Sequence, residues 1–483
     1  MGTCWFYLQI AGMNDREIIR AGFKFQATPQ QEVVFGLLAD FLKSREGDEC
    51  FLLRGYAGTG KTSIVSGLVK VLPQLKWKSV LLAPTGRAAK VISNYSGRQA
   101  FTIHKKIYKK KSAIDPDSHF VRAENLATNT LFIVDEASMI SDTISDSKLF
   151  ENGSLLDDLM QFVYSGHQCK LLLIGDKAQL PPVKSEISPA LDADQLELQY
   201  HKKVMSIELD EVVRQSQDSG ILMNATQLRD VLNRQVYESF QFNLKPFKDI
   251  VRLVDGYEIM EAINEAYDTE GHEETAIIVR SNKRANLYNK QIRERILNNE
   301  NELTVGDFLM VVKNNYFWVK PTTEAGFIAN GDIIQVLELF SIKELYGFRF
   351  AEVKVQMVDY PKMKPFETVL LLDTIDAEAP SLSYEQSNTL YQEVQKDYED
   401  ETSKYKKFLK IKNNPHFNAL QVKFSYAITC HKSQGGQWNT VFVEQPYLPN
   451  GIDKEYLRWL YTAVTRAKQK LYLIGFKDDF FNS

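Results

Sequence analysis

The chain has 483 residues, of which 44% are hydrophobic and 25% charged, with a formal net charge of −4. That length accommodates two to four domains, and that apolar content supports real hydrophobic cores, so a disordered scaffold is excluded. No apolar run reaches the roughly 20 residues that a membrane-spanning helix needs. Nucleic-acid modules usually carry a basic excess, so any path for a polyanion on this acidic chain must be a local groove.

The chain has four cysteines, and none of them has a neighbour at a paired spacing: Cys4, Cys50, Cys169 and Cys430. This distribution argues against a zinc ribbon, an iron–sulfur cluster or a disulfide framework, and it fits a reducing compartment inside the cell. The first twelve residues lack a basic region and a cleavage site, so they do not form a secretory signal. A short arm, or a natural start after residue 12, accounts for them.

Short apolar runs alternate with amphipathic stretches in two parts of the chain. Each run predicts a buried parallel strand that ends in a functional loop. The first set is 50–53, 79–83, 131–134 and 171–174, and the second set is 275–279, 426–429, 440–443 and 471–474. Two α/β sheets follow from this pattern.

Two insertions interrupt the alternation. Turn residues flanked by strand-like residues predict a β-hairpin at about residues 103–127. From about Thr304 to Asp359 the pattern changes to short β segments, which predict a small barrel. The charged, proline-free stretch from Ser383 to Lys412 predicts a helical excursion from that barrel.

The segment from Gly55 to Thr62 matches G-x-x-x-x-G-K-[ST] directly after an apolar strand. Its glycines let backbone N–H groups surround phosphates, Lys61 supplies positive charge at the β and γ oxygens, and Thr62 can coordinate Mg²⁺. An ordinary glycine-rich turn is the alternative. The candidate nucleotide-binding residues here are Gly55, Ala57, Gly58, Thr59, Gly60, Lys61 and Thr62.

Two acidic residues follow the strand at 131–134 and would lie at one edge of the phosphate site. Asp135 is the candidate to hold Mg²⁺ through water, and Glu136 is the candidate general base that polarises the attacking water. The alternative is a strand followed by acidic residues that cap a helix.

An ATPase also needs a group that senses the γ-phosphate and cations that neutralise charge in the transition state. Gln179, within the run 175–182, is the sensor candidate, and Arg214 and Arg466 are the cation candidates. Taken singly, each arginine is better explained as a solvated surface charge, because arginine is mostly exposed in proteins.

In their order along the chain, these motifs resemble those of superfamily-1 helicases, and most closely the RecD and Dda branch. The resemblance covers nearly the whole chain and is least diagnostic from about 305 to 412. The segments that carry it are 28–32, 55–62, 83–89, 135–138, 175–182, 429–435 and 461–466.

The resemblance implies an α/β fold with two RecA-like P-loop motor domains, a β-hairpin insert in the first and a small SH3-like β-barrel insert in the second. We place the first motor domain at residues 1–215. The second runs over 216–300 and 415–483, and the barrel with its helical excursion occupies 301–414.

The resemblance also assigns roles to single residues. It implies that Gln31 recognises adenine, that Gln179 couples the γ-phosphate to DNA, and that the two arginines act from opposite a cleft between the motor domains. Small hydroxyls and backbone amides can grip phosphates without selecting a sequence. The family-matched positions for a DNA track are Pro84, Thr85, Arg87, Thr102, His104, Thr429, His431 and Ser433.

Two features of the predicted hairpin have more than one interpretation. The lysine-rich run 105–111 is a phosphate-contacting edge, a nuclear-localisation-like run or a solvated face. Phe120, close to the expected tip, either stacks on the base pair being split or packs inward.

The resemblance implies an ATP- and Mg²⁺-dependent motor that moves 5′ to 3′ on single-stranded DNA and separates forked or tailed duplexes. We expect a monomer without membrane contact, in the cytoplasm of a bacterial or phage-infected cell. A DNA-stimulated ATPase switch that does not unwind is the second hypothesis, and a motor directed at RNA is the third.

Overall fold

The computed structural model describes residues 12–110, 120–143, 154–183, 185–212, 218–235, 237, 239–320, 323 and 325–481. The chain forms two compact units, the first ending at residue 233 and the second starting at 234, with residues 85–87 grouped with the second. Within the described ranges, no helix is both long enough and apolar enough to cross a bilayer.

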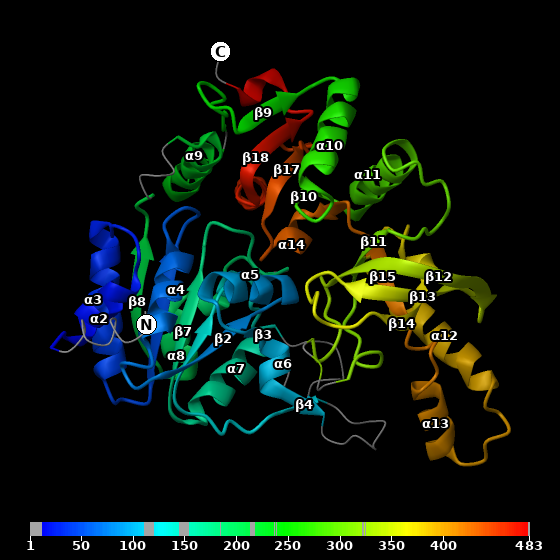
Figure 1. Ribbon diagram of the computed structural model, residues 1–483, viewed down its shortest axis with the longest axis horizontal. Coiled ribbons are helices and arrows are strands. Elements are labelled where there is room, and N and C mark those ends of the chain that lie inside the picture. The colour runs from blue at the N-terminus through cyan, green and yellow to red at the C-terminus, as the bar shows by residue number, and fades with distance from the viewer. Residues whose placement is uncertain are drawn as a thin grey trace, which may run out of the picture. The chain divides into compact units, whose positions relative to one another are not determined.

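The first unit is built on a six-stranded sheet in the order β3-β2-β6-β7-β1-β8 (Figure 1). All neighbouring strands in it are parallel. Its strands are β1 (Glu49–Gly55), β2 (Lys78–Ala83), β3 (Ala100–Thr102), β6 (Thr128–Val134), β7 (His167–Gly175) and β8 (Lys203–Leu209). The four strands predicted from apolar runs in this part of the chain are confirmed.

Helices cover both faces of this sheet. Phe51 and Leu53 of β1 pack into one core, whereas Cys50 and Leu52 pack into the other, because successive strand residues point to opposite faces. The first core includes α2 (Asp15–Gly22), α3 (Pro29–Lys43), α4 (Lys61–Val71) and α5 (Gly86–Ser96), and the second includes α6 (Ile103–Ile107), α7 (Leu155–Tyr164) and α8 (Ala193–Tyr200). Burial on both faces explains why the strand sequences are continuously apolar.

Capping residues set the starts of the first helices. The side chains of Asn14 and Thr28 accept hydrogen bonds from the backbone N–H groups of Glu17 and Gln31, whose side chains accept hydrogen bonds from the capping residues in return. Pro29 begins α3, where a missing N–H costs no helical hydrogen bond.

The remaining elements of the first unit include the predicted hairpin. β4 (Tyr108–Lys110) and β5 (Phe120–Arg122) form a separate two-stranded antiparallel sheet, which confirms a hairpin within residues 103–127. Two short 3-10 turns, η1 (Ala137–Met139) and η2 (Pro189–Leu191), lie beside the large sheet. Helix α9 (Gly220–Arg234) ends the unit, although we expected the second domain to start at residue 216.

The second unit contains a parallel five-stranded sheet in the order β16-β10-β17-β18-β9. Its strands are β9 (Ile250–Leu253), β10 (Thr275–Val279), β16 (Ala427–Thr429), β17 (Trp438–Glu444) and β18 (Ala467–Ile474). The accompanying helices are α10 (Gly256–Glu270), α11 (Asn282–Arg295), α14 (Cys430–Ser433), α15 (Lys454–Val464) and the 3-10 turn η5 (Asp478–Phe480). The second predicted α/β sheet is therefore also confirmed.

A closed five-stranded barrel is inserted into the second unit (Figure 1). It consists of β11 (Phe308–Val311), β12 (Ile333–Leu345), β13 (Phe348–Met357), β14 (Phe366–Leu371) and β15 (Leu420–Phe424), with the turn η4 (Leu372–Thr374). The expected helical excursion is present as α12 (Tyr384–Lys396) and α13 (Lys404–Lys412). The barrel passes the expected boundary at residue 414, because β15 pairs with both β11 and β14 and thereby closes it.

A buried ion pair joins the barrel to the sheet on which it is inserted. The Arg293 guanidinium in α11 donates to both carboxylate oxygens of Asp307, at 3.0 and 2.9 Å. Asp307 also accepts a hydrogen bond from the Tyr426 hydroxyl at 2.9 Å and one from the Thr304 backbone N–H at 2.8 Å. Four donors therefore satisfy one fully buried carboxylate at the point where the chain enters the barrel.

Substituting Asp307→Ala should lower the free energy of unfolding by about 3 kcal/mol, because it leaves the Arg293 charge buried without its partner. Urea unfolding of the full chain measures this. Glu294→Ala, which breaks an exposed pair with Lys290, is the control and should cost no more than about 0.5 kcal/mol. Equal costs for the two substitutions would contradict the importance of the buried pair.

Candidate active site

The sheet of the first unit brings most of the predicted catalytic residues to one edge. Strands β6, β7 and β1 are neighbours and parallel, so their carboxyl ends lie together. The glycine-rich loop follows β1, the acidic pair follows β6, and the loop with Gln179 follows β7. Residues about 120 positions apart in the sequence are thereby combined in one site.

The glycine-rich loop has the backbone that phosphate binding requires. Gly58 and Gly60 have φ angles of 79° and 84°, in the region that favours glycine. Helix α4 begins at Lys61, so its free N–H groups and its positive dipole end face the loop. The Lys61 ammonium donates to the carbonyl oxygens of Gly55 and Tyr56 at 2.6 and 2.8 Å, which holds it over the loop.

The acidic pair is held in a strained turn. The Asp135 carboxylate accepts a hydrogen bond from the Glu136 backbone N–H at 2.9 Å. Glu136 has a φ of 52°, which is rare for a residue with a side chain and is a form of strain found at functional sites. Burial, and secondarily the charge of Glu136, raises the pKa of Asp135 well above its usual range. A nearby cation would stabilise the ionised form of Asp135.

Two buried oxygens beside this pair have no hydrogen-bond partner among the described residues. They are Oε1 of Gln179, a residue with 7% exposure, and Oγ of Ser138. A buried polar atom without a partner costs free energy, so such atoms are expected where a polar ligand binds. The orphaned oxygens fit a bound phosphate group with its attacking water.

The side chain of Gln31 is almost fully buried at 1% exposure. Its Oε1 accepts a hydrogen bond from the Thr28 backbone N–H at 3.0 Å, and its Nε2 donates to the Thr59 carbonyl oxygen at 3.0 Å. Gln31 therefore links the start of α3 to the glycine-rich loop. One N–H of its amide remains for the adenine contact that the resemblance implies.

Three residues that the sequence did not single out surround the first turn of the loop. The Tyr56 hydroxyl donates to Glu208 Oε1 at 2.5 Å, and Lys177, two residues before Gln179, pairs with Glu208 Oε2 at 2.7 Å. Glu208 thus connects the loop after β7 with the loop after β1. Burial and the neighbouring Glu208 raise the pKa of Tyr56, so its hydroxyl stays protonated.

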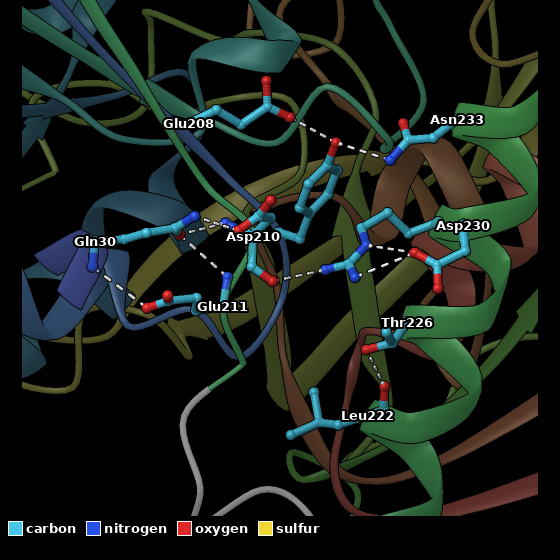
Figure 2. Close-up of polar contacts among 10 residues, drawn as sticks. Gln30, Glu208, Asp210, Glu211, Leu222, Thr226, Asp230 and Asn233 are labelled. Atoms are coloured by element: carbon cyan, nitrogen blue, oxygen red, sulfur yellow. Dashed lines mark hydrogen bonds and ion pairs between the residues drawn. The ribbon is translucent and has the colours of Figure 1, made fainter. Parts of the chain in front are cut away.

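Helix α9 covers the other side of Tyr56. Figure 2 shows Asn233 and Asp230 on this helix, facing Glu208 and Asp210 at the end of β8. The Arg229 guanidinium lies 4.8 Å from the centre of the Tyr56 ring and donates to the Asp210 carbonyl oxygen at 3.1 Å. No local pattern marks this arginine, because the contact depends on how α9 packs against the loop.

Gln30 connects the start of α3 to the same strand end (Figure 2). Its Oε1 accepts hydrogen bonds from the backbone N–H groups of Asp210 and Glu211 at 2.9 and 3.2 Å, and its Nε2 donates to the Asp210 carboxylate. Glu211 accepts a hydrogen bond from the Gln30 backbone N–H at 3.3 Å. The start of α3 and the end of β8 therefore form one polar cluster beside the loop.

Of the two arginines predicted to neutralise charge in the transition state, the structure describes only Arg466. Arg466 lies in the second unit at 2% exposure, and its guanidinium donates to the carbonyl oxygens of Thr462 and Gly436 at 2.9 and 3.2 Å. These contacts hold the charge in a fixed place before β18. Arg214 lies outside the described residues.

The DNA-track positions between Pro84 and His104 lie at two neighbouring strand ends. Pro84 and Thr85 follow β2, Arg87 lies in the first turn of α5, and Thr102 ends β3. The Thr102 hydroxyl accepts a hydrogen bond from the Lys105 backbone N–H at 3.2 Å and caps α6. Burial lowers the pKa of His104 to about 4, so its imidazole is neutral at physiological pH.

The second-unit positions follow β16. Thr429 precedes the short helix α14, in which His431 is exposed and Ser433 is fully buried. The Ser433 hydroxyl donates to the Cys430 carbonyl oxygen at 2.7 Å, so it is already engaged within the helix. Although His431 as a whole is exposed, partial desolvation of its imidazole lowers its pKa.

Mg²⁺ would have few protein ligands here. Among the described residues, no group of three or more His, Cys, Asp or Glu side chains could hold a metal ion. Mg²⁺ bound with a nucleotide needs only one or two protein oxygens, because phosphates and water supply the others. The Thr62 hydroxyl at the start of α4 and the Asp135 carboxylate are oxygen donors of that kind.

Comparison with known proteins identifies two domain families in the chain. Residues 35–238 match the AAA domain, and residues 424–474 match the UvrD-like helicase C-terminal domain. The chain is 24% identical to an uncharacterized protein of Acanthamoeba polyphaga mimivirus, over 92% of this chain and 98% of that one. It is 25% identical to the ATP-dependent DNA helicase dda of Enterobacteria phage T4, over 64% and 67% of the two chains. It is 26% identical to the RecBCD enzyme subunit RecD of Buchnera aphidicola, over 89% and 71%.

Substituting Tyr56→Phe removes the hydroxyl that binds Glu208 and keeps the ring beside Arg229. Because the lost hydrogen bond has a charged acceptor and is partly buried, the free energy of unfolding should fall by about 1.5 kcal/mol. Urea unfolding measures the change. Tyr95→Phe, at a tyrosine with 54% exposure, is the control and should stay within about 0.5 kcal/mol of the wild type.

Proposed function

Because this chain is a superfamily-1 helicase of the RecD and Dda type, we propose that it is an ATP-driven DNA helicase that moves 5′ to 3′ on single-stranded DNA. Its substrates are forked or tailed duplexes, and its working form is a monomer. The observation that carries the proposal is the shared sheet edge, where the phosphate loop and the acidic pair lie beside the strand ends that carry the DNA-track candidates.

The residues at this edge have different roles in ATP hydrolysis. The loop and the start of α4 bind the phosphates, and Lys61 leaves its two carbonyl acceptors to neutralise the γ-phosphate. Glu136 accepts the proton of the attacking water. Thr62 and, through water, Asp135 would hold Mg²⁺, which would neutralise charge on the phosphates. Arg214 and Arg466 neutralise the charge that develops in the transition state.

Gln179 couples hydrolysis to movement. Its orphaned Oε1 binds the γ-phosphate site through water, and its loop connects through Lys177 and Glu208 to the phosphate loop. Loss of the γ-phosphate shifts this loop between two states. The grip of Pro84, Thr102 and His104 in the first unit then alternates with the grip of the second-unit positions, and DNA advances.

The decisive test measures ATPase activity with and without single-stranded DNA, together with strand separation on forks that carry only a 5′ or only a 3′ tail. DNA should stimulate the ATPase, and only the 5′-tailed fork should be unwound. Lys61→Ala should abolish both activities. Glu136→Gln should lower turnover roughly 100-fold or more while the chain still binds ATP and DNA.

Three results would contradict the proposal. Unwinding from the 3′ tail alone would show that the polarity is wrong. DNA-stimulated hydrolysis without strand separation from either tail would favour the alternative of an ATPase switch. Equal stimulation by RNA, with unwinding of RNA forks, would favour an RNA-directed motor.

The pKa of about 4 at His104 leads to a separate prediction about DNA binding. A neutral imidazole displaces no counterion from a phosphate, so His104→Gln should leave the salt dependence of DNA affinity unchanged. Arg87→Gln should reduce the slope of log Kd against log salt by about 1, because it removes one charged phosphate contact. Binding titrations at several salt concentrations and at pH 6 and 8 test both statements. A reduced slope for His104→Gln at pH 8 would show that the imidazole is charged.

A further inference from the structure

The β4–β5 hairpin is too small to be stable by itself. Each strand has three residues, and the pair forms a sheet of its own, separate from the six-stranded sheet. An isolated two-stranded hairpin is at best marginally stable in water. Its orientation on the first unit must therefore come from side chains that attach it to a larger element.

One buried carboxylate on α7 receives a side chain from each strand of the hairpin. Tyr108 and Arg122 are directly paired across the two strands, so their side chains lie on the same face. The Tyr108 hydroxyl donates to Asp158 Oδ2 at 2.7 Å, and the Arg122 guanidinium lies 3.7 Å from Asp158 Oδ1. Asp158 itself has 1% exposure.

The position of Asp158 in the first turn of α7 does not by itself explain why its side chain is buried. An acidic side chain there interacts favourably with the helix dipole, but an exposed one would do so equally well. Burying a carboxylate costs free energy unless it is paired and hydrogen-bonded. The Tyr108 hydroxyl and the Arg122 guanidinium, both from the hairpin, offset this cost, so the docked hairpin stabilises the buried Asp158 carboxylate.

Further contacts attach the base of the hairpin along the same helix. Arg122 donates a hydrogen bond to Gln161, one turn beyond Asp158. Asn125, just after β5, donates to the carbonyl oxygens of Phe162 and Val163 at 2.9 and 3.1 Å. Helix α7 is itself anchored, because five of its side chains are buried in the core: Leu156, Leu159, Met160, Phe162 and Val163.

The hairpin base is also in contact with the DNA-track candidates. The rings of His104 and Tyr108 are 5.7 Å apart, across the end of α6. The Ala123 backbone N–H donates to the Ile107 carbonyl oxygen at 2.7 Å and closes the base of the hairpin. A force on the hairpin would therefore be transmitted both to α7 and to the strand end that carries His104.

We propose that Asp158 is a positioning residue for strand separation, because its carboxylate fixes the β4–β5 hairpin on α7 while DNA is pulled past it. The inference rests on the proposed helicase function and assigns a role that hydrolysis does not need. Asp158 lies on α7, which packs on one face of the six-stranded sheet, whereas α4, which follows the phosphate loop, packs on the other face. Loss of its contacts should therefore impair unwinding and spare the ATPase.

The test compares Tyr108→Phe and Asp158→Asn with the wild-type full chain. ATPase activity stimulated by single-stranded DNA should stay at the wild-type level. The rate of unwinding a 5′-tailed fork should fall about ten-fold, since small misplacements of a working group have large effects on rate. The losses in the double variant should be less than additive, because Tyr108 and Arg122 both bind the one Asp158 carboxylate.

The neighbouring residue of α7 offers a matched control. Asp157 accepts a hydrogen bond from the Tyr200 hydroxyl at 2.6 Å, which ties α7 to α8 and leaves the hairpin untouched. Tyr200→Phe therefore removes the same kind of bond from the same helix. It should change neither the ATPase nor the unwinding rate. If Tyr200→Phe lowered the unwinding rate and left the ATPase unchanged, the effect would be a property of α7 in general. That result would overturn the proposal.

Hydrogen exchange gives a readout that does not require unwinding. Backbone amides of residues 107–110 and 120–123 should exchange faster in Asp158→Asn than in Tyr200→Phe. Unchanged exchange, or a parallel fall of ATPase and unwinding in the Asp158 variant, would overturn the positioning role. If the wild-type chain hydrolyses ATP on DNA and separates no strands, the proposed function fails, and exchange still shows whether Asp158 anchors the hairpin.

Discussion

The parallel arrangement of the sheet in the first unit is the constraint on which the rest of this structure depends. Parallel strands end at a common edge, so every loop that follows a carboxyl end opens on the same side. The order β3-β2-β6-β7-β1 then arranges the loops by role: DNA-track candidates follow β3 and β2, the acidic pair follows β6, and the sensor and phosphate loops follow β7 and β1. The candidates for nucleotide chemistry and for nucleic-acid contact therefore share one edge of the sheet.

Two kinds of buried polar group can be distinguished in this protein: groups whose hydrogen bonds are satisfied within the chain, and groups with atoms that have no partner among the described residues. Asp307 is buried and satisfied by four donors, which stabilises the junction of barrel and sheet. Near the phosphate loop the opposite holds. Gln179 and Ser138 have buried oxygens without partners among the described residues, and Glu136 has a strained backbone. Unpaired buried oxygens and a strained backbone cost free energy, and such costs are expected where a polar or charged ligand binds.

The hairpin illustrates how a small insertion obtains a fixed direction. Its strands are too short to be stable alone, so a cross-strand pair of side chains and one buried carboxylate attach it to a helix whose other face is in the core. The proposed roles separate two tasks: residues at the sheet edge would hydrolyse ATP, and the contacts of Asp158 in the first turn of α7 would hold the hairpin in place.

The sequence by itself determined the elements and the chemistry that is local in the chain. Continuous apolar runs predicted the strands of both sheets, and the loop from Gly55 to Thr62, the pair Asp135 and Glu136, and the turn residues of the hairpin were recognisable because their spacing along the chain is the chemical signal. The family resemblance then supplied the two-domain fold with its hairpin and barrel. The roles of all the candidate site residues, Arg214 and the track residues among them, remain predictions.

Only the tertiary structure decided which distant residues meet. Glu208 and Arg229 have ordinary local sequences, and they join the phosphate loop only because β8 is the neighbour of β1 and α9 packs over Tyr56. The barrel boundary was misplaced for the same reason, since β15 is identified as a barrel strand by its partners and not by its composition. Asp157 and Asp158 are adjacent and identical in type, yet one binds α8 and the other binds the hairpin. Helix periodicity points neighbouring side chains in different directions, and what lies in each direction is a property of the fold.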